Sequence, residues 1–229
     1  SDGDNLKLTF YPYSPFEIEK GELTIIQTTN KKFYFDVING LKNLDRLVLS
    51  QDDEKIDAKL SLVNLDDVVT NTEQTLKFKT KIKNDVLNNL NDDNRKRLFR
   101  LDAEMKEIFL GAAYLDDFPI QVDEDWDINK QYAYTGTKLL NVNHDNPYDI
   151  IKEVLNLYAK FDSKKLLVLK NLFNYLYSNQ IESLVQMIKA LELNVLILDF
   201  SSEDYSTFLE ECRYYCVDRD FVRWDSADR

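Results

Sequence analysis

Two short stretches of the sequence concentrate side chains of one charge, and each could bind a ligand of the opposite charge. One stretch alternates lysines with other residues, at Lys77, Lys79, Lys81 and Lys83. The other holds six carboxylates within twelve residues, at Asp116, Asp117, Asp123, Glu124, Asp125 and Asp127. Ammonium groups attract phosphates, and clustered carboxylate oxygens attract hard cations such as calcium. The chemistry that these residues offer is therefore ionic binding.

The lysine stretch can be read in two ways. Alternation with a period of two predicts a strand with one lysine face. The apolar ladder continues at Val86, Leu87 and Leu90, however, and this favours a helix with lysine rows at 77/81 and 79/83. Such rows fit contacts with phosphates, and they equally fit an ordinary solvated helix face. A second basic cluster, Arg95 to Arg97 with Arg100, is expected to pair locally with aspartates 92, 93 and 102.

The acidic stretch lacks the spacing and the distal glutamate of an EF-hand loop. A solvated acidic loop and a cation site both remain open for it. Catalytic motifs are absent, because the sequence contains neither a GxSxG elbow nor an HExxH pair. The single histidine, His144, lies in an Asn-rich stretch that is typical of a surface turn. Cys212 and Cys216 are one helical turn apart and are expected to be reduced cysteines near a buried face.

The elements that would position these residues are clearest near the C-terminus. Continuous apolar runs at 166–169 and 195–198 are typical of strands buried on both faces of a parallel sheet. The stripe from Ile181 to Leu191 between them predicts a helix, with Asn179 and Glu182 as a capping box. The result is a βαβ unit, whose crossover should be right-handed.

A second unit of this kind precedes it. Short strands are expected at 16–18 and 23–26, joined by a turn at Lys20-Gly21, before a helix from Phe33 to Leu41 and a strand at 47–49. In a nucleotide-binding fold, the turn after the strand at 23–26 would carry a glycine-rich phosphate loop. The turn from Thr28 to Lys32 contains no glycine. Leu198-Asp199 has the outline of a magnesium-binding strand end, but nucleotide hydrolysis is not expected without that loop.

Between these units the pattern changes to helical stripes. Apolar residues at 78–90, 98–112 and 151–158 predict three helices, the last following Asn146-Pro147 as cap and first helical position. The sequence therefore predicts an α/β protein with a globular head of residues 1–64 and 162–229. The head should have a parallel βαβ core, P-loop-like without a phosphate loop, and an extended helical leg should be inserted at 65–161.

Composition narrows the class of protein. The net charge of −12 argues against a general nucleic-acid binder unless basic residues gather in one place. Low counts of 5 Gly and 4 Pro argue against a disordered chain. No apolar run approaches the roughly 18 residues of a membrane span, and the start of the sequence is acidic and polar rather than signal-like. We expect a soluble intracellular protein with no membrane contact.

The order of these pieces resembles the Csn-two family, the small ring-forming adaptation proteins of type II-A CRISPR systems. The resemblance is carried by Pro15 to Lys20 leading into Leu23–Ile26, by Leu76-Lys77 with Leu87 to Asp92, and by Lys164 to Leu169 through Asn194 to Leu198. It implies a homotetrameric ring in the bacterial cytoplasm that encloses double-stranded DNA and binds linear DNA through its ends. It also implies calcium in the leg, a role beside the CRISPR integrase complex and the effector nuclease, and no enzymatic activity.

Carried over to this sequence, the resemblance assigns calcium to Asp123, Glu124 and Asp125, with Asp117 and Asp127 as possible additions. It assigns DNA contact to Lys164 and Lys165, with the lysines at 77, 79, 81 and 83 as further candidates. The alternative is a protein-interaction scaffold, in which the acidic surface recruits basic partners and DNA contact is incidental.

Overall fold

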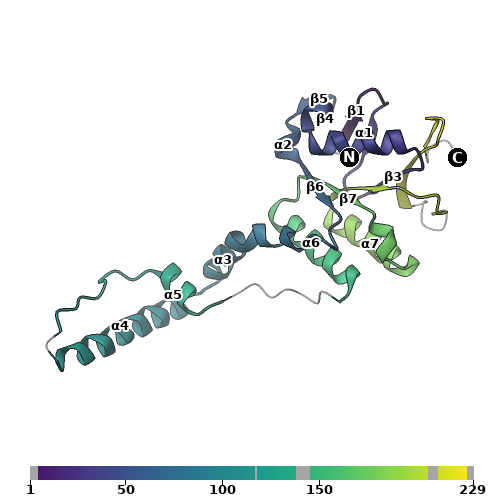
Figure 1. The fold of residues 1–229 in the computed structure, drawn as a ribbon. Helices are drawn as coiled ribbons and strands as arrows, with labels where there is room; N and C mark the ends of the chain where they lie inside the picture. The colour runs from purple at the N-terminus through teal and green to yellow at the C-terminus, as the bar shows by residue number, and fades with distance from the viewer. Residues whose placement is uncertain (1–4, 117, 138–144, 206–210, 226–229) are drawn as a thin grey trace. The chain divides into compact units, whose positions relative to one another are not determined.

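The computed structural model of the chain describes residues 5–116, 118–137, 145–205 and 211–225. The chain folds into two compact units (Figure 1). The head unit comprises Ser1–Thr75 and Asn141–Arg229, and the leg unit comprises Leu76–Leu140.

The head unit is built on a six-stranded sheet with the order β10-β9-β3-β8-β7-β6. Its strands are β3 (Leu23–Thr28), β6 (Leu62–Asp66), β7 (Leu166–Lys170), β8 (Asn194–Asp199), β9 (Cys212–Val217) and β10 (Arg223–Asp225). All neighbours are parallel except β9 and β10, which are antiparallel. Every residue of β3, β7 and β8 is buried, as the continuous apolar runs at 166–169 and 195–198 predict.

A second sheet in the head unit is antiparallel, with the order β2-β1-β4-β5. Its strands are β1 (Leu6–Phe10), β2 (Phe16–Ile18), β4 (Leu47–Gln51) and β5 (Glu54–Ile56). The strands expected on either side of Lys20-Gly21 exist as β2 and β3, but they do not pair with each other. The turn instead carries the chain from one sheet to the other, and Gly21 takes a φ of 79° there.

Helices cover both faces of the parallel sheet (Figure 1). On one face, α1 (Lys31–Lys42) buries Phe33, Val37 and Leu41 in a core that also contains side chains of β7, β8 and the antiparallel sheet. On the other, α7 (Ser178–Leu191) contacts β3 and α6 (Pro147–Phe161). The head unit also contains the short helix α2 (Ala58–Ser61) and 3₁₀ turns at Leu44–Arg46, Thr72–Gln74 and Leu172–Tyr175.

The start of α6 agrees with the sequence-based prediction, whereas the start of α7 differs from it. Asn146 caps α6 by accepting a hydrogen bond from the Tyr148 amide at 3.0 Å, and Pro147 is the first helical residue, as predicted. Helix α7 begins one residue before Asn179. Its capping box uses Tyr177, whose amide donates to the Gln180 side chain at 2.9 Å, rather than Asn179 and Glu182.

The leg unit consists of a 3₁₀ turn at Leu76–Phe78, then α3 (Lys79–Asn88), α4 (Asp92–Tyr114) and α5 (Ile128–Tyr134). Buried apolar side chains are few in its described part, and they are Phe78, Leu87 and Ala113. In neither unit does a described helix combine the length and apolar character that crossing a membrane requires.

The expected fold class is confirmed: the chain is an α/β protein with a parallel βαβ core and an inserted helical part. The unit boundaries lie at 75/76 and 140/141 rather than at 64/65 and 161/162. Helix α6, expected in the leg, buries Ile151, Val154 and Leu155 within the head unit. Cys212 and Cys216 lie on strand β9 rather than a helix, so about 13 Å of extended backbone separates them.

Candidate nucleic-acid interface

The lysine stretch begins in the 3₁₀ turn and continues into α3. The helical prediction is confirmed from Lys79 onward, and the side chains of Lys77, Lys79 and Lys81 are exposed. Lys83 is partly exposed. The structure therefore places all four lysines on one short segment of the leg unit, the 3₁₀ turn and the start of α3.

Phe78 organises one of the two lysine rows. The residue is 1% exposed, and the Nζ atoms of Lys77 and Lys81 lie 5.4 Å and 5.8 Å from its ring centroid. Ammonium groups are attracted to the negative face of an aromatic ring at such distances. Phe78 thus attracts both ammonium groups to its ring.

The start of α3 adds positive character to this place. No side chain caps the helix N-terminus, and its first turn contains no acidic residue. The partial positive charge of a helix N-terminus normally favours carboxylates over lysines. Lys79 and Lys81 in this turn therefore strengthen the local attraction for anions instead of neutralising it.

The second basic cluster has a structural role that the sequence did not predict. The guanidinium of Arg95 donates to the carbonyls of Leu87 and Leu90, the latter at 3.2 Å, and so satisfies acceptors at the end of α3. Asp102, one of its expected partners, instead pairs with Lys106 at 2.7 Å. A cation following a helix end by a few residues is the signal that points to such a cap.

Lys164 and Lys165 lie in the head unit, in the turn between α6 and β7. Lys164 is exposed, whereas Lys165 is partly buried and lies 3.8 Å from the Asp162 carboxylate. Of the two, Lys164 is the better placed to contact a phosphate. The six lysines predicted to contact DNA therefore come from both units.

Two of the carboxylates predicted to bind calcium, those of Asp123 and Asp127, are engaged by other groups. Lys130 lies 2.7 Å from Asp123, and its hydrogen bond holds the pKa of that carboxyl below its usual range. Asp127 caps α5 by accepting from the Asn129 amide at 2.8 Å, while Glu124 and Asp125 are exposed. Asp117 lies outside the described residues.

The fit to calcium can be tested on this arrangement. Calcium takes about six to eight oxygen ligands that converge on one point. Among the residues that the structure describes, no three histidine, cysteine, aspartate or glutamate side chains are grouped to hold a metal ion. The described part of the acidic segment does not fit a calcium site in this conformation.

The carboxyl edge of the parallel sheet is where α/β proteins bind nucleotides. Asp199, at the end of β8, is 1% exposed and accepts hydrogen bonds from Ser201 and, at 2.6 Å, from Tyr205. Burial and this contact raise the pKa of Tyr205 above its ordinary value. The carboxylate therefore has two hydroxyl partners in the position suggested for magnesium.

The end of β3 is engaged in the same way. The Gln27 amide donates to Ser201 at 3.0 Å and to the Glu203 carbonyl at 2.9 Å. Asn30 caps α1 by accepting from the Phe33 amide, and its side chain donates to the carbonyls of Asp218 and Arg219. The Gln27 and Asn30 side chains near this helix start thus already have partners within the chain.

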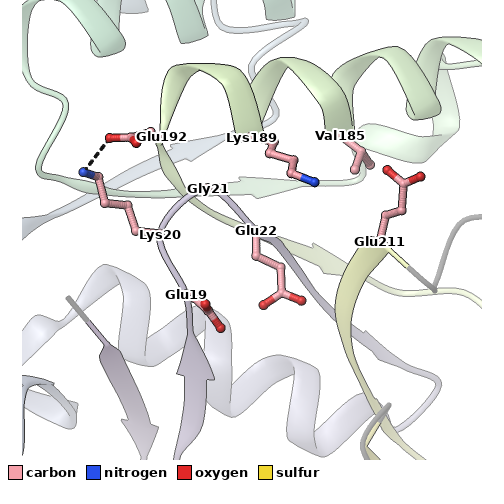
Figure 2. A pocket seen from close by; sticks show the side chains of 8 residues that line it. All are labelled: Glu19, Lys20, Gly21, Glu22, Val185, Lys189, Glu192 and Glu211. Carbon is pink, nitrogen blue, oxygen red and sulfur yellow. Dashed lines mark hydrogen bonds and ion pairs between the residues drawn. The ribbon is translucent and has the colours of Figure 1, made fainter. Parts of the chain in front are cut away.

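A cavity of about 540 Å³ lies at the opposite edge, between the β2–β3 turn and the end of α7 (Figure 2). Four glutamates and two lysines are among the residues that line it: Glu19, Glu22, Glu192, Glu211, Lys20 and Lys189. Lys20 pairs with Glu192 at 2.9 Å, and burial raises the pKa of Glu22. With this excess of carboxylates, the cavity is unfavourable for a phosphate.

Taken together, the head and leg define a class of protein: an α/β protein with a parallel sheet and an inserted helical unit, without a glycine-rich phosphate loop. No family model matches the sequence, and no curated protein matches it.

Among solved structures, the chain is similar to Stu0660 of Streptococcus thermophilus, with a TM-score of 0.55 and 11% identity over 93% of this chain and 74% of that one. The match shows the fold. An ATP-binding subunit of an ABC transporter aligns over 98% of this chain and 91% of its own, with 12% identity and a TM-score of 0.46.

Proposed function

We propose that this chain is a non-catalytic, double-stranded-DNA-binding protein of CRISPR adaptation, of the Csn-two type. The observation that carries the proposal is the likeness in fold to Stu0660, a structure of that type, over 93% of the chain. The sequence resemblance rests on residues in both units, and the fold likeness also extends across nearly the whole chain. The two lines of support therefore concern the same protein type.

The proposed contact with DNA runs through phosphates and carries no sequence preference. The pair Lys77 and Lys81 over Phe78, the second row at Lys79 and Lys83, and Lys164 in the head supply the positive groups. Local charge of this kind is compatible with a net charge of −12, because phosphates respond to the groups that they touch.

Self-assembly into a homotetrameric ring is part of the proposal. The leg unit leaves large apolar side chains exposed along α4, including Leu101 at 46%, Ile108 at 71% and Phe109 at 62%. Leu101 and Ile108 are seven residues apart and so share one helix face, and exposed apolar surface on one face is a feature of interaction sites in soluble proteins. We propose that copies of the chain bury this surface between them and so form the ring. The ring would enclose linear DNA that is threaded from an end. Its partners would be the CRISPR integrase complex and the effector nuclease.

A separate observation supports the non-catalytic part of the proposal. Asp199, Gln27 and Asn30, at the edge where a nucleotide would bind, hydrogen-bond to other parts of the chain. A nucleotide phosphate would have to displace these partners. Calcium is left out of the proposed mechanism because the described carboxylates do not fit it.

Gel-shift binding to linear and circular duplexes of equal length tests the proposal. Retention of the linear duplex alone is expected for a threaded ring, and it should weaken steeply with salt. Equal retention of both forms would support contact with DNA but contradict the threading of DNA through a ring. Binding of neither form by an intact tetramer would overturn the proposal.

That last outcome would favour the alternative, a scaffold that recruits basic proteins. The observation behind it is the glutamate-lined cavity of Figure 2, which suits a lysine or arginine side chain of a partner. Substituting Glu19 and Glu211 with glutamine separates the two: it should leave a DNA-binding ring unaffected and weaken a scaffold's capture of the integrase complex.

A further inference from the structure

The acidic segment, residues 123–127, is folded against α4 by contacts within the leg unit. The Trp126 ring meets Phe99 edge to face, with centroids 5.7 Å apart. Its indole N–H donates to Gln131 Oε1 at 3.1 Å, and the Gln131 amide donates to the Leu98 carbonyl at 2.9 Å. This chain of contacts fixes the segment between α4 and α5.

Two ammonium groups from different helices lie among the carboxylates of the segment. Lys130 of α5 approaches Asp123 Oδ2 to 2.7 Å. Lys106 of α4 donates to the Asp125 carbonyl at 3.1 Å and pairs with Asp102. The Lys106 and Asp102 side chains are only 23% and 16% exposed, so this pair is better shielded from solvent than most surface pairs.

Several of the oxygens that a calcium ion would need already accept hydrogen bonds from the chain. Asp123 accepts from the Asp125 amide through Oδ1 and from Lys130 through Oδ2. Asp127 accepts from the Asn129 amide, and the Asp125 carbonyl accepts from Lys106. A divalent cation at Asp123 would also meet the positive charge of Lys130 at close range.

We infer that Lys130 is the counterion of the acidic segment, that Lys106 ties the segment's backbone to α4, and that this chain folds the segment without calcium. The inference departs from the calcium role that the resemblance implies. It concerns the leg unit alone and does not depend on whether the protein binds DNA.

The test uses the full chain carrying Trp224→Phe, so that Trp126 is the only one of the 2 tryptophans left to report. Calcium chloride is titrated from micromolar to millimolar concentration while tryptophan emission and the unfolding midpoint are recorded. Sodium chloride at equal ionic strength controls for screening. Lys130→Gln is the test variant, and Lys96→Gln, an exposed lysine of the same unit, is the matched control.

The expected result is an emission and a midpoint that calcium leaves unchanged in the parent and in Lys96→Gln. Lys130→Gln should gain a calcium response, because Asp123 Oδ2 and its neighbours lose their counterion. A saturable response of the parent at micromolar calcium, reversed by chelator, would overturn the inference. A Lys130→Gln variant that responds to calcium no more than the parent does would also overturn the inference, because Lys130 would then not occupy the place of a cation.

Discussion

Lys170 Nζ lies 2.6 Å from Asp66 Oδ1 and so joins the carboxyl ends of neighbouring strands β7 and β6. The lysine side chain is 6% exposed, while the aspartate side chain is 52% exposed. A buried ammonium needs a hydrogen-bonded partner, because an unpaired buried charge is costly. Asp66 therefore supplies the charge that lets Lys170 end a strand inside the head unit.

Asp66→Asn should lower the free energy of unfolding by about 1–3 kcal/mol, because it leaves a buried ammonium without its charged partner. Urea denaturation measures this change. Asp53→Asn is the matched control: Asp53 pairs with Lys7 and, like Asp66, has a positive φ, but its side chain is 81% exposed. Its substitution should cost clearly less, because exposed ion pairs contribute little to stability. Equal losses would contradict the assigned role of Lys170.

Lys77→Gln with Lys81→Gln should weaken binding to linear duplex and reduce the slope of log affinity against log salt by about 2, one for each phosphate that is no longer neutralised. Phe78→Leu should reproduce part of this effect, because it keeps an apolar side chain but removes the ring that holds both ammonium groups. Fluorescence anisotropy over a salt series measures the slope.

The lysine substitutions should matter less when Phe78 is already leucine, since the ring and the two lysines act together. Lys96→Gln is the control for removal of a charge elsewhere in the leg unit. Additive effects in the combined variant would show that Phe78 does not position these lysines.

Lys164→Glu with Lys165→Glu should abolish retention of linear DNA while the assembled state survives. The change reverses two charges in the turn before β7, and Lys164 is exposed there. Gel shift reports retention, and light scattering reports the assembly. Lys152→Glu, on the exposed side of α6, is the control. Unchanged retention would show that this turn does not contact DNA.

Tyr205→Phe should destabilise the chain by about 1–3 kcal/mol, because buried Asp199 then loses one of its two hydroxyl donors. We expect no phosphate release from ATP in the parent or in this variant, and no shift of the unfolding midpoint on adding ATP with magnesium. A phosphate-release assay and thermal unfolding measure both effects. Release by the parent would show that the carboxyl edge accepts nucleotide.

Cys212 should react with iodoacetamide far more slowly than Cys216 in the native protein. Burial raises the pKa of the Cys212 thiol to about 12, and the thiolate is the reactive form. Because ionisation is disfavoured in the folded state, the thiol should also make stability fall as pH rises above about 8.5, the unfolded value. Mass spectrometry of timed reactions gives the rates, and in urea the two rates should converge.

The strands at the centre of the head were predictable because each contains a run of consecutive apolar residues, which indicates burial on both faces. Leu166–Leu169 and Val195–Leu198 have no polar alternation, and the stripe from Ile181 to Leu191 repeats with a helical period. The α3 ladder and the Asn146-Pro147 start are local signals of the same kind. Cys212 and Cys216 are free, with Cys212 buried and Cys216 partly buried, as expected, but they lie on a strand because a spacing of four also fits one face of a strand.

For the candidate sites, too, some features were predictable from the sequence and others required the structure. The lysine rows could be placed from the sequence, since residues three and four apart share a helix face. The Phe78 ring beneath Lys77 and Lys81 required coordinates. For the acidic segment, the carboxylates were evident from residue types alone, but Lys106 was not, because it arrives from a different helix.

By itself, the sequence determined the α/β class, the missing phosphate loop and the positions of the basic and acidic stretches. Those features depend on residue types and on short periods along the chain. The tertiary structure decided which strands share a sheet, that Asp66 meets Lys170, and that Lys130 pairs with Asp123 in the acidic segment. The physical reason is that periodicity specifies which face is buried, whereas partners distant along the chain are chosen only when the elements pack.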